Sequence, residues 1–394
     1  MLKILLVHNS YRNSYRQSGG EDVVVMAERE LLKSHGHDVK FFGVSNCAIR
    51  GILKKISTAR QSSYSIGSRV RIAQEISSFK PDIVHVHNFF PLLTPSIYDA
   101  CREAGVPVVQ TLHNFRMICP GALLLRKDMI CEECLCGNVY RAAFYRCYRR
   151  SFLASLAVCR MVDYHRRHDT WREKVDCFIA LTDFARDKFI KAGFPADKIV
   201  VKPNFINYEP PIGKGEGGYA LFAGRLSHEK GVKMLIKAWK RLSGTIPLKI
   251  AGDGPLAGWV AKETESMPSV EWLGYRQRPE VVALMQDASV LIFPSIGYEG
   301  FGMSIIEAYS VGLPVIAGDL GAMSLLVAHG RTGLHFRPGE AQDLAAQIQW
   351  AFSHPTELAG MRLEAHAEFE MKYTARINYG LLMDIYEKSI AARR

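Results

Sequence analysis

Short apolar runs alternate with longer amphipathic stretches along almost all of the 394 residues of this chain. The alternation is typical of parallel β-sheets whose strands are joined by crossover helices. The expected strands are Lys3–His8, Val39–Gly43, Ile83–His87, Val108–His113, Cys177–Leu181, Tyr219–Gly224, Leu248–Gly252, Val270–Leu273, Val290–Phe293, Pro314–Ala317 and Gly333–Phe336. Helices fit between them, for example at Glu21–Ser34, Lys230–Arg241 and Ala341–Ala351. We therefore expect an α/β protein.

The segment Pro203 to Gly218 divides the chain, because it is rich in Pro and Gly and has no periodicity. It predicts a first domain that ends at residue 203, a linker at 204–218 and a second domain from residue 219. The two halves share an architecture but no sequence repeat. This favours two Rossmann-like, doubly wound sheets that face each other across a cleft, and it argues against a repeat array.

Composition narrows the class of partner. Apolar residues make up 48% of the chain and charged residues 23%, as in soluble globular proteins. The formal charge of +11 favours an anionic partner, such as nucleotide phosphates, nucleic acid or an anionic membrane surface. Nucleic acid is the poorest of these, because the charge concentrates in one segment and the aromatics do not form stacking platforms.

The chain shows no sign of a targeting or membrane-spanning segment. The first apolar run is too short for a signal peptide, and no run approaches the roughly 18 to 20 apolar residues of a membrane span. Nine mostly scattered cysteines fit a reducing compartment. We expect a cytoplasmic protein.

The segment Pro294 to Ala308 is the most informative for function. Glu299 follows an apolar strand, and Glu307 lies inside the helix that comes next. A strand end that leads into a helix N-terminus is where doubly wound sheets bind ligands, and it favours anions. Carboxylates there can accept hydrogen bonds from vicinal hydroxyls. The segment therefore predicts a site for a phosphorylated sugar.

Two further loops follow the first strand of each half. Arg225 and Lys230, five residues apart, can point at one cavity and neutralise a diphosphate, whereas the alternative is a solvated basic turn. Gly19 and Gly20 open the first helix and would let a pyrophosphate approach the backbone. The alternative there is an ordinary loop.

Two histidines, His87 and His113, each end a strand of the first half. A neutral imidazole at such a place can hydrogen-bond a sugar hydroxyl or a leaving phosphate. For either residue, a histidine satisfied within the core or a loop is the commoner explanation.

Five cysteines fall within 29 residues, at Cys119, Cys131, Cys134, Cys136 and Cys147. A C-x2-C pair with further cysteines about a dozen residues away can close a tetrahedral zinc site. The first choice of ligands is Cys119, Cys131, Cys134 and Cys147, which makes the site structural. Buried or loop thiols, or a redox pair, are the alternatives.

A basic segment runs from Arg141 to Lys174, with aromatic and aliphatic residues interleaved among its arginines. It predicts a basic amphipathic helix that can lie on an anionic membrane surface. A charged face that covers the first domain is the alternative.

Together these pieces resemble the retaining nucleotide-sugar glycosyltransferases of family 4, with the two-domain GT-B fold. The resemblance is strongest from Tyr219 to Gly333. The matching motifs are Gly224-Arg225-Leu226, Glu229-Lys230-Gly231, Gly252-Asp253-Gly254-Pro255, Glu299-Gly300-Phe301-Gly302, Glu307-Ala308 and Gly312-Leu313-Pro314-Val315. The cysteine- and arginine-rich residues 115–172 lie outside the general pattern and mark a subgroup. Residues 373–394 resemble the terminal helix that returns to the first domain, so the second domain would be 219–372.

The resemblance assigns roles to these residues. Arg225 and Lys230 would hold the diphosphate, with Gly19 and Gly20 approaching it from the first domain. Glu307 would accept from the ribose, and Glu299 would contact the transferred sugar. The remaining donor contacts and the histidine near the leaving phosphate would come from Gly254, Tyr275, Arg276, Gly300, Phe301, Gly302, Met303 and His113.

The reaction implied is retaining transfer from a UDP- or GDP-sugar to a saccharide or lipid-linked acceptor, in bacterial cell-surface polysaccharide or glycan synthesis. Catalysis would need no metal, because Arg225 and Lys230 take its place; zinc would be structural. The enzyme would be cytoplasmic or peripheral on the inner face of the membrane. A sugar-nucleotide epimerase or hydrolase, and a non-catalytic nucleotide-binding membrane protein, are the competing functions.

Overall fold

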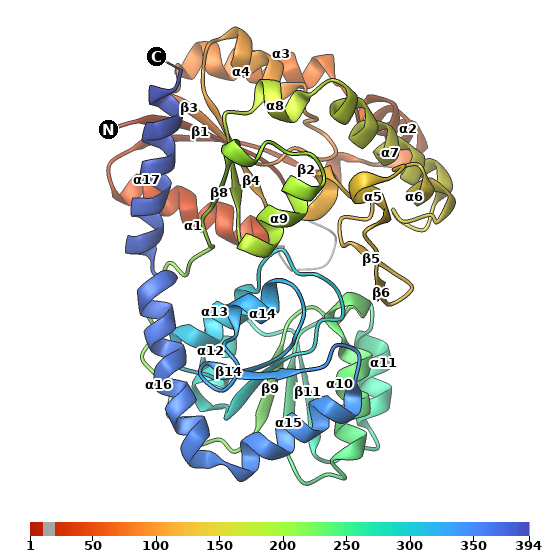
Figure 1. Ribbon diagram of the computed structural model, residues 1–394, viewed down its shortest axis with the longest axis vertical. Helices are drawn as coiled ribbons and strands as arrows, with labels where there is room; N and C mark the ends of the chain where they lie inside the picture. The colour runs from red at the N-terminus through yellow and green to blue at the C-terminus, as the bar shows by residue number, and fades with distance from the viewer. Residues whose placement is uncertain (11–19, 394) are drawn as a thin grey trace. The chain divides into compact units, whose positions relative to one another are not determined.

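The computed structural model describes residues 1–10 and 20–393. Two units fold around separate cores. Unit 1 comprises residues 1–126, 131–204 and 378–394, and unit 2 comprises 127–130 and 205–377. Each unit contains one six-stranded parallel sheet with helices packed on it (Figure 1). The expectation of two doubly wound α/β domains is confirmed.

Unit 1 has the strand order β2-β1-β3-β4-β7-β8. Its strands are β1 (Lys3–Ser10), β2 (Asp38–Ser45), β3 (Ile83–Asn88), β4 (Val108–Leu112), β7 (Cys177–Ala180) and β8 (Ile199–Val201). Its helices are α1 (Gly20–Ser34), α2 (Gly51–Gln61), α3 (Ile66–Phe79), α4 (Ile97–Glu103), α5 (Glu133–Cys136), α6 (Arg141–Phe144), α7 (Phe152–Arg167), α8 (Thr170–Lys174) and α9 (Asp183–Lys191). The short strand β5 (Leu125–Arg126) also belongs to unit 1, whereas the short strand β6 (Met129–Ile130) belongs to unit 2.

The last helix, α17 (Ala375–Ala391), contributes to the core of unit 1. Leu382, Ile385 and Tyr386 of α17 pack with residues of the central strands, such as Ile4 and Ile83. The Tyr386 hydroxyl also lies 2.7 Å from Nδ1 of His85 in β3. The chain therefore completes the first core with its final residues.

Unit 2 has the strand order β11-β10-β9-β12-β13-β14. Its strands are β9 (Ala220–Ala223), β10 (Leu248–Ala251), β11 (Val270–Gly274), β12 (Val290–Phe293), β13 (Val315–Gly318) and β14 (Gly333–Phe336). Its helices are α10 (Val232–Arg241), α11 (Ala257–Thr264), α12 (Arg278–Asp287), α13 (Met303–Ser310), α14 (Ala322–Leu326), α15 (Ala341–Ser353) and α16 (Pro355–Lys372). The order is that of dinucleotide-binding sheets.

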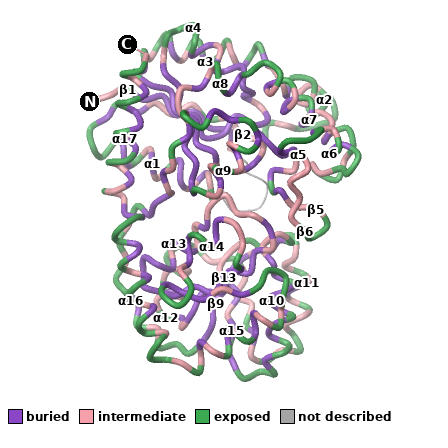
Figure 2. The backbone as a smooth tube through the Cα atoms, viewed as in Figure 1, coloured by how far each residue is buried: buried purple, intermediate pink, exposed green. Residues whose placement is uncertain are grey.

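The strands of unit 2 are continuous apolar runs because both faces of the sheet are covered. Successive residues point to opposite faces, so Val290 and Ile292 enter the core beneath α10 and α15, whereas Leu291 and Phe293 enter the core beneath α13 and α16. Figure 2 shows both sets of strands as buried segments surrounded by exposed helix faces.

The eleven strands expected from the sequence are all present, whereas three local expectations need correction. The sequence pattern missed β5, β6 and β8, which have only two or three residues each. Helix α10 begins at Val232 rather than Lys230, because Gly231 is in the left-handed region with φ 69° and ends a preceding turn of 3-10 helix. Residues 141–174 form α6, α7 and α8 rather than one helix, and positive φ at Arg146, Arg149 and Arg150 accompanies the break.

Candidate functional site

The strand order of unit 2 reverses between β9 and β12, and ligands bind at the carboxyl ends of strands at such a switch point. The loops that follow these two strands are Gly224–Gly231 and Pro294–Gly302. They meet through the backbone: the Ile296 N–H donates to the Glu229 carbonyl at 3.1 Å. The two segments that the sequence singled out are thus brought together.

Glycines make this close approach possible. A Cβ at Gly231 would lie 1.8 Å from the Pro294 carbonyl oxygen, and Gly231 also has φ 69°. A Cβ at Gly252 would lie 1.9 Å from the Gly224 carbonyl oxygen, and one at Gly254 would lie 2.5 Å from that of Leu226. No side chain fits at these contacts, so the loops pack backbone against backbone.

Lys230 and Glu299 form an ion pair at this edge of the sheet. The Lys230 Nζ lies 2.8 Å from Glu299 Oε1, and the Ser295 hydroxyl donates to the same oxygen at 2.6 Å. Both side chains are partly exposed, at 29% for Lys230 and 16% for Glu299. Two predicted donor residues therefore contact each other, and an anion that reaches Lys230 must compete with Glu299.

Glu307 pairs with a residue that the sequence pattern did not single out. Arg278, the first residue of α12, donates to Glu307 Oε1 at 3.0 Å. It also lies over the Tyr208 ring, 4.5 Å from its centroid. Burial raises the pKa of Glu307, whereas the charge and hydrogen bond of Arg278 lower it. Arg278 therefore favours the charged form of this carboxylate.

Arg225 differs from Lys230 in that its side chain is exposed and forms no ion pair with the residues that the structure describes. Tyr275 is 43% exposed, and Arg276 lies 3.7 Å from Glu280. The remaining predicted donor residues precede or open α13, with Gly302 as its N-cap and Met303 as its first residue; they are Gly300, Phe301, Gly302 and Met303. The backbone N–H groups at this helix end are suited to an anion.

The switch point of unit 1 lies between β1 and β3. Gly20 is the first residue of α1, and Gly19 lies outside the described residues. The next residue, Glu21, was not predicted, yet Asn88 and Asn114 donate to its two oxygens at 2.7 Å and 3.3 Å. Burial raises the pKa of Glu21 to about 7. A carboxyl group with a shifted pKa at a ligand-binding edge is a candidate functional group.

Buried ionisable groups lie directly beneath this edge. His113 Nε2 lies 2.9 Å from His87 Nδ1, so the two predicted histidines contact each other. His87 Nε2 lies 3.2 Å from Glu28 Oε1, and Lys202 Nζ lies 3.4 Å from Glu28 Oε2. Burial lowers the pKa of His87 to about 3 and lowers that of His113. Both imidazoles are therefore neutral at pH 7.

The Glu28 group was not visible in the sequence. Glu28, His85 and His87 present ligand atoms within 4.8 Å of one another, the only such group of three among residues 1–10 and 20–393. Lys202 already neutralises Glu28, and the Thr111 hydroxyl lies 2.8 Å from His85 Nε2. We assign this buried group a structural role.

The cysteine cluster lies in unit 1, and all its thiols are free. Cys119 and Cys134 are buried, and Cys131 and Cys147 are half-buried. Burial, together with the neighbouring Cys119, Cys147 and Cys131, raises the pKa of Cys134 to about 12. Cys136 is instead exposed and donates to the Lys191 carbonyl at 3.2 Å. Cys136 is thus separated from the other four.

The sheets and the residues at their carboxyl edges define a two-domain α/β protein of the GT-B type. Sucrose-phosphate synthase of Thermosynechococcus elongatus has this fold, with a TM-score of 0.73 at 15% identity over 100% of both chains. Anabaena HepE, solved in complex with UDP-glucose, gives a TM-score of 0.69 at 18% identity over 98% of this chain and 100% of its own. At these identities the likeness shows the fold alone.

Family models match both halves of the chain. A model described as glycosyltransferase family 4 matches residues 18–209, and one described as glycosyl transferases group 1 matches residues 217–354. This chain belongs to the family 4 glycosyltransferases.

Individual characterised relatives align with a smaller part of this chain than the two family models do together. Glycogen synthase of Mycobacterium tuberculosis is 33% identical over 141 residues, 34% of this chain and 34% of its own length. The D-rhamnosyltransferase WbpZ of Pseudomonas aeruginosa is 31% identical over 162 residues, 40% of this chain and 42% of its own length. The chain therefore aligns with less than half of each of these relatives.

Proposed function

We propose that this chain transfers a sugar, with retention of anomeric configuration, from a nucleoside diphosphate sugar to a saccharide or lipid-linked saccharide. The observation that carries the proposal is the meeting of Lys230, Glu299 and the N-terminus of α13 at the switch point of unit 2. Lys230 and the free N–H groups suit phosphate oxygens, whereas Glu299 suits sugar hydroxyls. The UDP-glucose complex of HepE supports a nucleotide sugar as donor.

The ion pair between Lys230 and Glu299 would be exchanged when the donor binds. A diphosphate carries more negative charge than one carboxylate, so Lys230 would turn toward it. Glu299 would keep the hydrogen bond from Ser295, 2.6 Å away, and would gain free lone pairs for the hydroxyls of the transferred sugar. Donor binding would thus free Lys230 for the diphosphate and Glu299 for the sugar hydroxyls in one step.

Transfer would follow a front-face path. The bond between the anomeric carbon and the β-phosphate oxygen would break as the acceptor oxygen attacks from the same side. The acceptor proton would pass to the departing phosphate, so no protein nucleophile is needed. Arg225, Lys230 and the α13 N-terminus would stabilise the charge that develops on the diphosphate. His113, neutral at pH 7, would be a hydrogen-bond partner rather than a cation.

The two cations would make a catalytic metal unnecessary. Turnover is expected to need no added Mg²⁺ or Mn²⁺, and a strict requirement for either ion would contradict this part of the proposal. Activity assays with a panel of nucleotide sugars and a panel of saccharide acceptors would identify the base, the sugar and the acceptor, and UDP- and GDP-sugars should be tested first. Polysaccharide synthesis is the expected setting, because an amylovoran biosynthesis glycosyltransferase of Erwinia amylovora is 25% identical over 251 residues.

The experiment that tests the proposal is product analysis. The chain is incubated with labelled nucleotide sugars and saccharide acceptors, and NMR of the new linkage reports the anomeric configuration. A product with the donor's configuration supports retaining transfer. Inverted product refutes retention, and release of free sugar or an epimerised donor in the presence of acceptors would assign the chain to the competing enzyme class.

We also propose that Cys119, Cys131, Cys134 and Cys147 bind a structural zinc ion. Gly121 lies between two of them, since a Cβ at Gly121 would be 3.7 Å from Cys119 Sγ and 3.6 Å from Cys147 Cβ. No three thiols of the described chain have sulfur atoms within 4.8 Å of one another, so zinc would require their side chains to rotate inward. The surrounding elements are very short, and a metal cross-link would stabilise them.

A further inference from the structure

An exposed apolar surface lies on unit 1, over α2, α6 and the first turn of α7. We call it the α2–α7 face and define its apolar members as Ile52, Leu53, Ile56, Phe144, Phe152 and Leu153. Leu53 and Leu153 are 85% and 75% exposed, and α2 has no buried residue at all. In Figure 2, where the tube is coloured by residue burial, much of α2 has the colour of exposed residues. Large aliphatic side chains gathered in this way mark an interaction surface.

The same face is strongly basic. The sequence has seven basic residues and no acidic residue between Asp38 and Glu75, and five arginines and no acidic residue between Glu133 and Asp163. These two stretches contain α2, α6 and most of α7. Six cations on or beside the face form no ion pair within the part of the chain that the structure describes; they are Arg50, Lys54, Lys55, Arg146, Arg149 and Arg150. Their charge is therefore available to an anionic partner.

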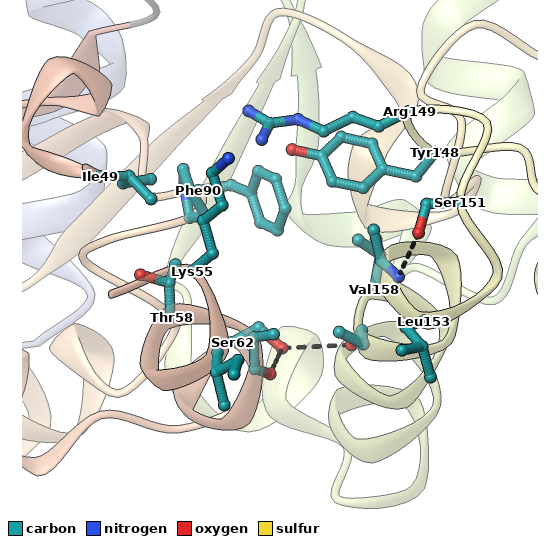
Figure 3. A pocket seen from close by; sticks show the side chains of 15 residues that line it. Ile49, Lys55, Thr58, Ser62, Phe90, Tyr148, Arg149, Ser151, Leu153 and Val158 are labelled. Carbon is teal, nitrogen blue, oxygen red and sulfur yellow. Dashed lines mark hydrogen bonds between the residues drawn. The ribbon is translucent and has the colours of Figure 1, made fainter. Parts of the chain in front are cut away.

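A cavity of about 420 Å³ opens between α2 and α7 (Figure 3). Ile49, Ile56, Leu153 and Val158 contribute apolar walls. Ser62, at the end of α2, donates to the Ala157 carbonyl at 3.1 Å and so joins the two helices.

The charged residues that line this cavity are cations, and the other polar lining residues are hydroxyl-bearing. Lys55 of α2 and Arg149, just before α7, both belong to it, and Figure 3 shows them toward the same end of the view. Phe90 and Tyr148 lie nearby with ring centroids 5.8 Å apart, and Arg149 lies 5.3 Å from the Tyr148 centroid. The cavity thus offers hydrocarbon walls with positive charge at one end, which suits an amphipathic anion.

We propose that the α2–α7 face docks on an anionic phospholipid bilayer. The aliphatic and aromatic side chains would enter the interfacial region, the cations would meet lipid phosphates, and the cavity would receive part of one lipid. Charge complementarity selects this occupant. A symmetric contact with a second copy would bring the same unpaired cations together, and exposed leucines and isoleucines offer bases no stacking platform.

The test is co-sedimentation of the full chain with vesicles of phosphatidylcholine alone or with about a third phosphatidylglycerol, whose anionic headgroups attract basic residues. Binding to the anionic vesicles is expected, with little binding to the neutral ones and weakening at high salt. Lys54→Gln with Lys55→Gln is expected to lower the partition coefficient about thirtyfold, at roughly fivefold per cation. Leu53→Gln with Leu153→Gln is expected to reduce binding as well, since it removes the apolar anchor.

Matched controls lie on unit 2. Leu363 and Met371 of α16 are 69% and 65% exposed, so Leu363→Gln with Met371→Gln makes the same kind of change elsewhere. This control is expected to bind vesicles like the unaltered chain. All the changed residues are exposed, so circular dichroism should be unaffected.

The proposal is overturned if the chain ignores anionic vesicles, or if the leucine pair and the control pair behave alike. It is also overturned if light scattering shows a dimer that the leucine pair dissociates while vesicle binding is absent, because the face would then join two copies. Sedimentation requires no donor and no turnover. Its outcome is therefore independent of the proposed glycosyl transfer.

Discussion

Acid should destabilise unit 1 through its buried histidines, and His87 allows the size of the effect to be worked out. Its folded pKa is about 3, because the ring is buried and lies near His85. An unfolded histidine has a pKa near 6.5. Between these values the unfolded chain binds more protons than the folded chain, so stability falls as the pH falls. From pH 7 to pH 5, His87 alone should cost about 2 kcal/mol of unfolding free energy.

The titration of Glu28, which lies beside His87, falls below the range from pH 5 to pH 7. The pKa of Glu28 is held well below its ordinary value of 4.5, despite its burial, by Lys202, His85 and His87. The stability it contributes is therefore lost only below pH 4.5. His113, whose pKa is also lowered, acts in the same direction as His87.

The assay is equilibrium unfolding in urea at pH 7 and pH 5, with hydrogen exchange of β3 identifying the transition of unit 1. His87→Asn should lose about 2 kcal/mol less than the unaltered chain between the two pH values. His168→Asn, at an exposed position of the same unit, should lose as much as the unaltered chain. An equal loss in His87→Asn and the unaltered chain would refute the reasoning.

Three other outcomes are expected. Gly231→Ala should lower the free energy of unfolding by about 1–2 kcal/mol because of its left-handed φ alone. The new Cβ, 1.8 Å from the Pro294 carbonyl oxygen, should lower it further. A thermal midpoint within a degree of the original would contradict the loop packing. Cys134→Ser should lower zinc content by mass spectrometry and the melting temperature, whereas Cys136→Ser should not; zinc-free purified protein contradicts the site. Arg278→Ala should raise the pKa of Glu307 further, because it removes the cation that favours the charged carboxylate. Donor affinity should therefore fall more at pH 5.5 than at pH 8. If calorimetry finds the same loss of affinity at both pH values, Arg278 does not act through the charge of Glu307.

Much of the fold could be predicted because both sheets are covered on both faces. A strand such as Val290–Phe293 is then an unbroken apolar run, which local pattern detects. The sequence pattern missed β8 because this strand has only three residues and Val200 is 36% exposed. Its apolar run is therefore too short and too mixed to predict a strand. The start of α10 was misplaced because the apolar pattern that predicts the helix does not reveal that Gly231 adopts a left-handed φ of 69° and ends a separate 3-10 turn.

The candidate site was predictable only where its residues follow a strand directly or lie in a recognisable motif. Lys230 and Glu299 could be predicted to lie near each other because each follows a strand at the same edge of one sheet. Arg278, 29 residues from Glu307, and Lys202, 174 residues from Glu28, follow no local pattern that would pair them. Such partners are set by tertiary packing, which also determines that Cys134 rather than Cys136 joins the other thiols.

The most direct measurement is calorimetric titration of UDP and GDP into the unaltered chain, Lys230→Ala, Arg225→Ala and Lys237→Ala, an exposed lysine on α10. At least one nucleotide should bind the unaltered chain and the Lys237→Ala control equally well. Its affinity should fall at least tenfold in each of the other two, at roughly 1.5–3 kcal/mol per lost charged hydrogen bond. Undiminished affinity in both Lys230→Ala and Arg225→Ala would contradict a diphosphate site at this edge of unit 2.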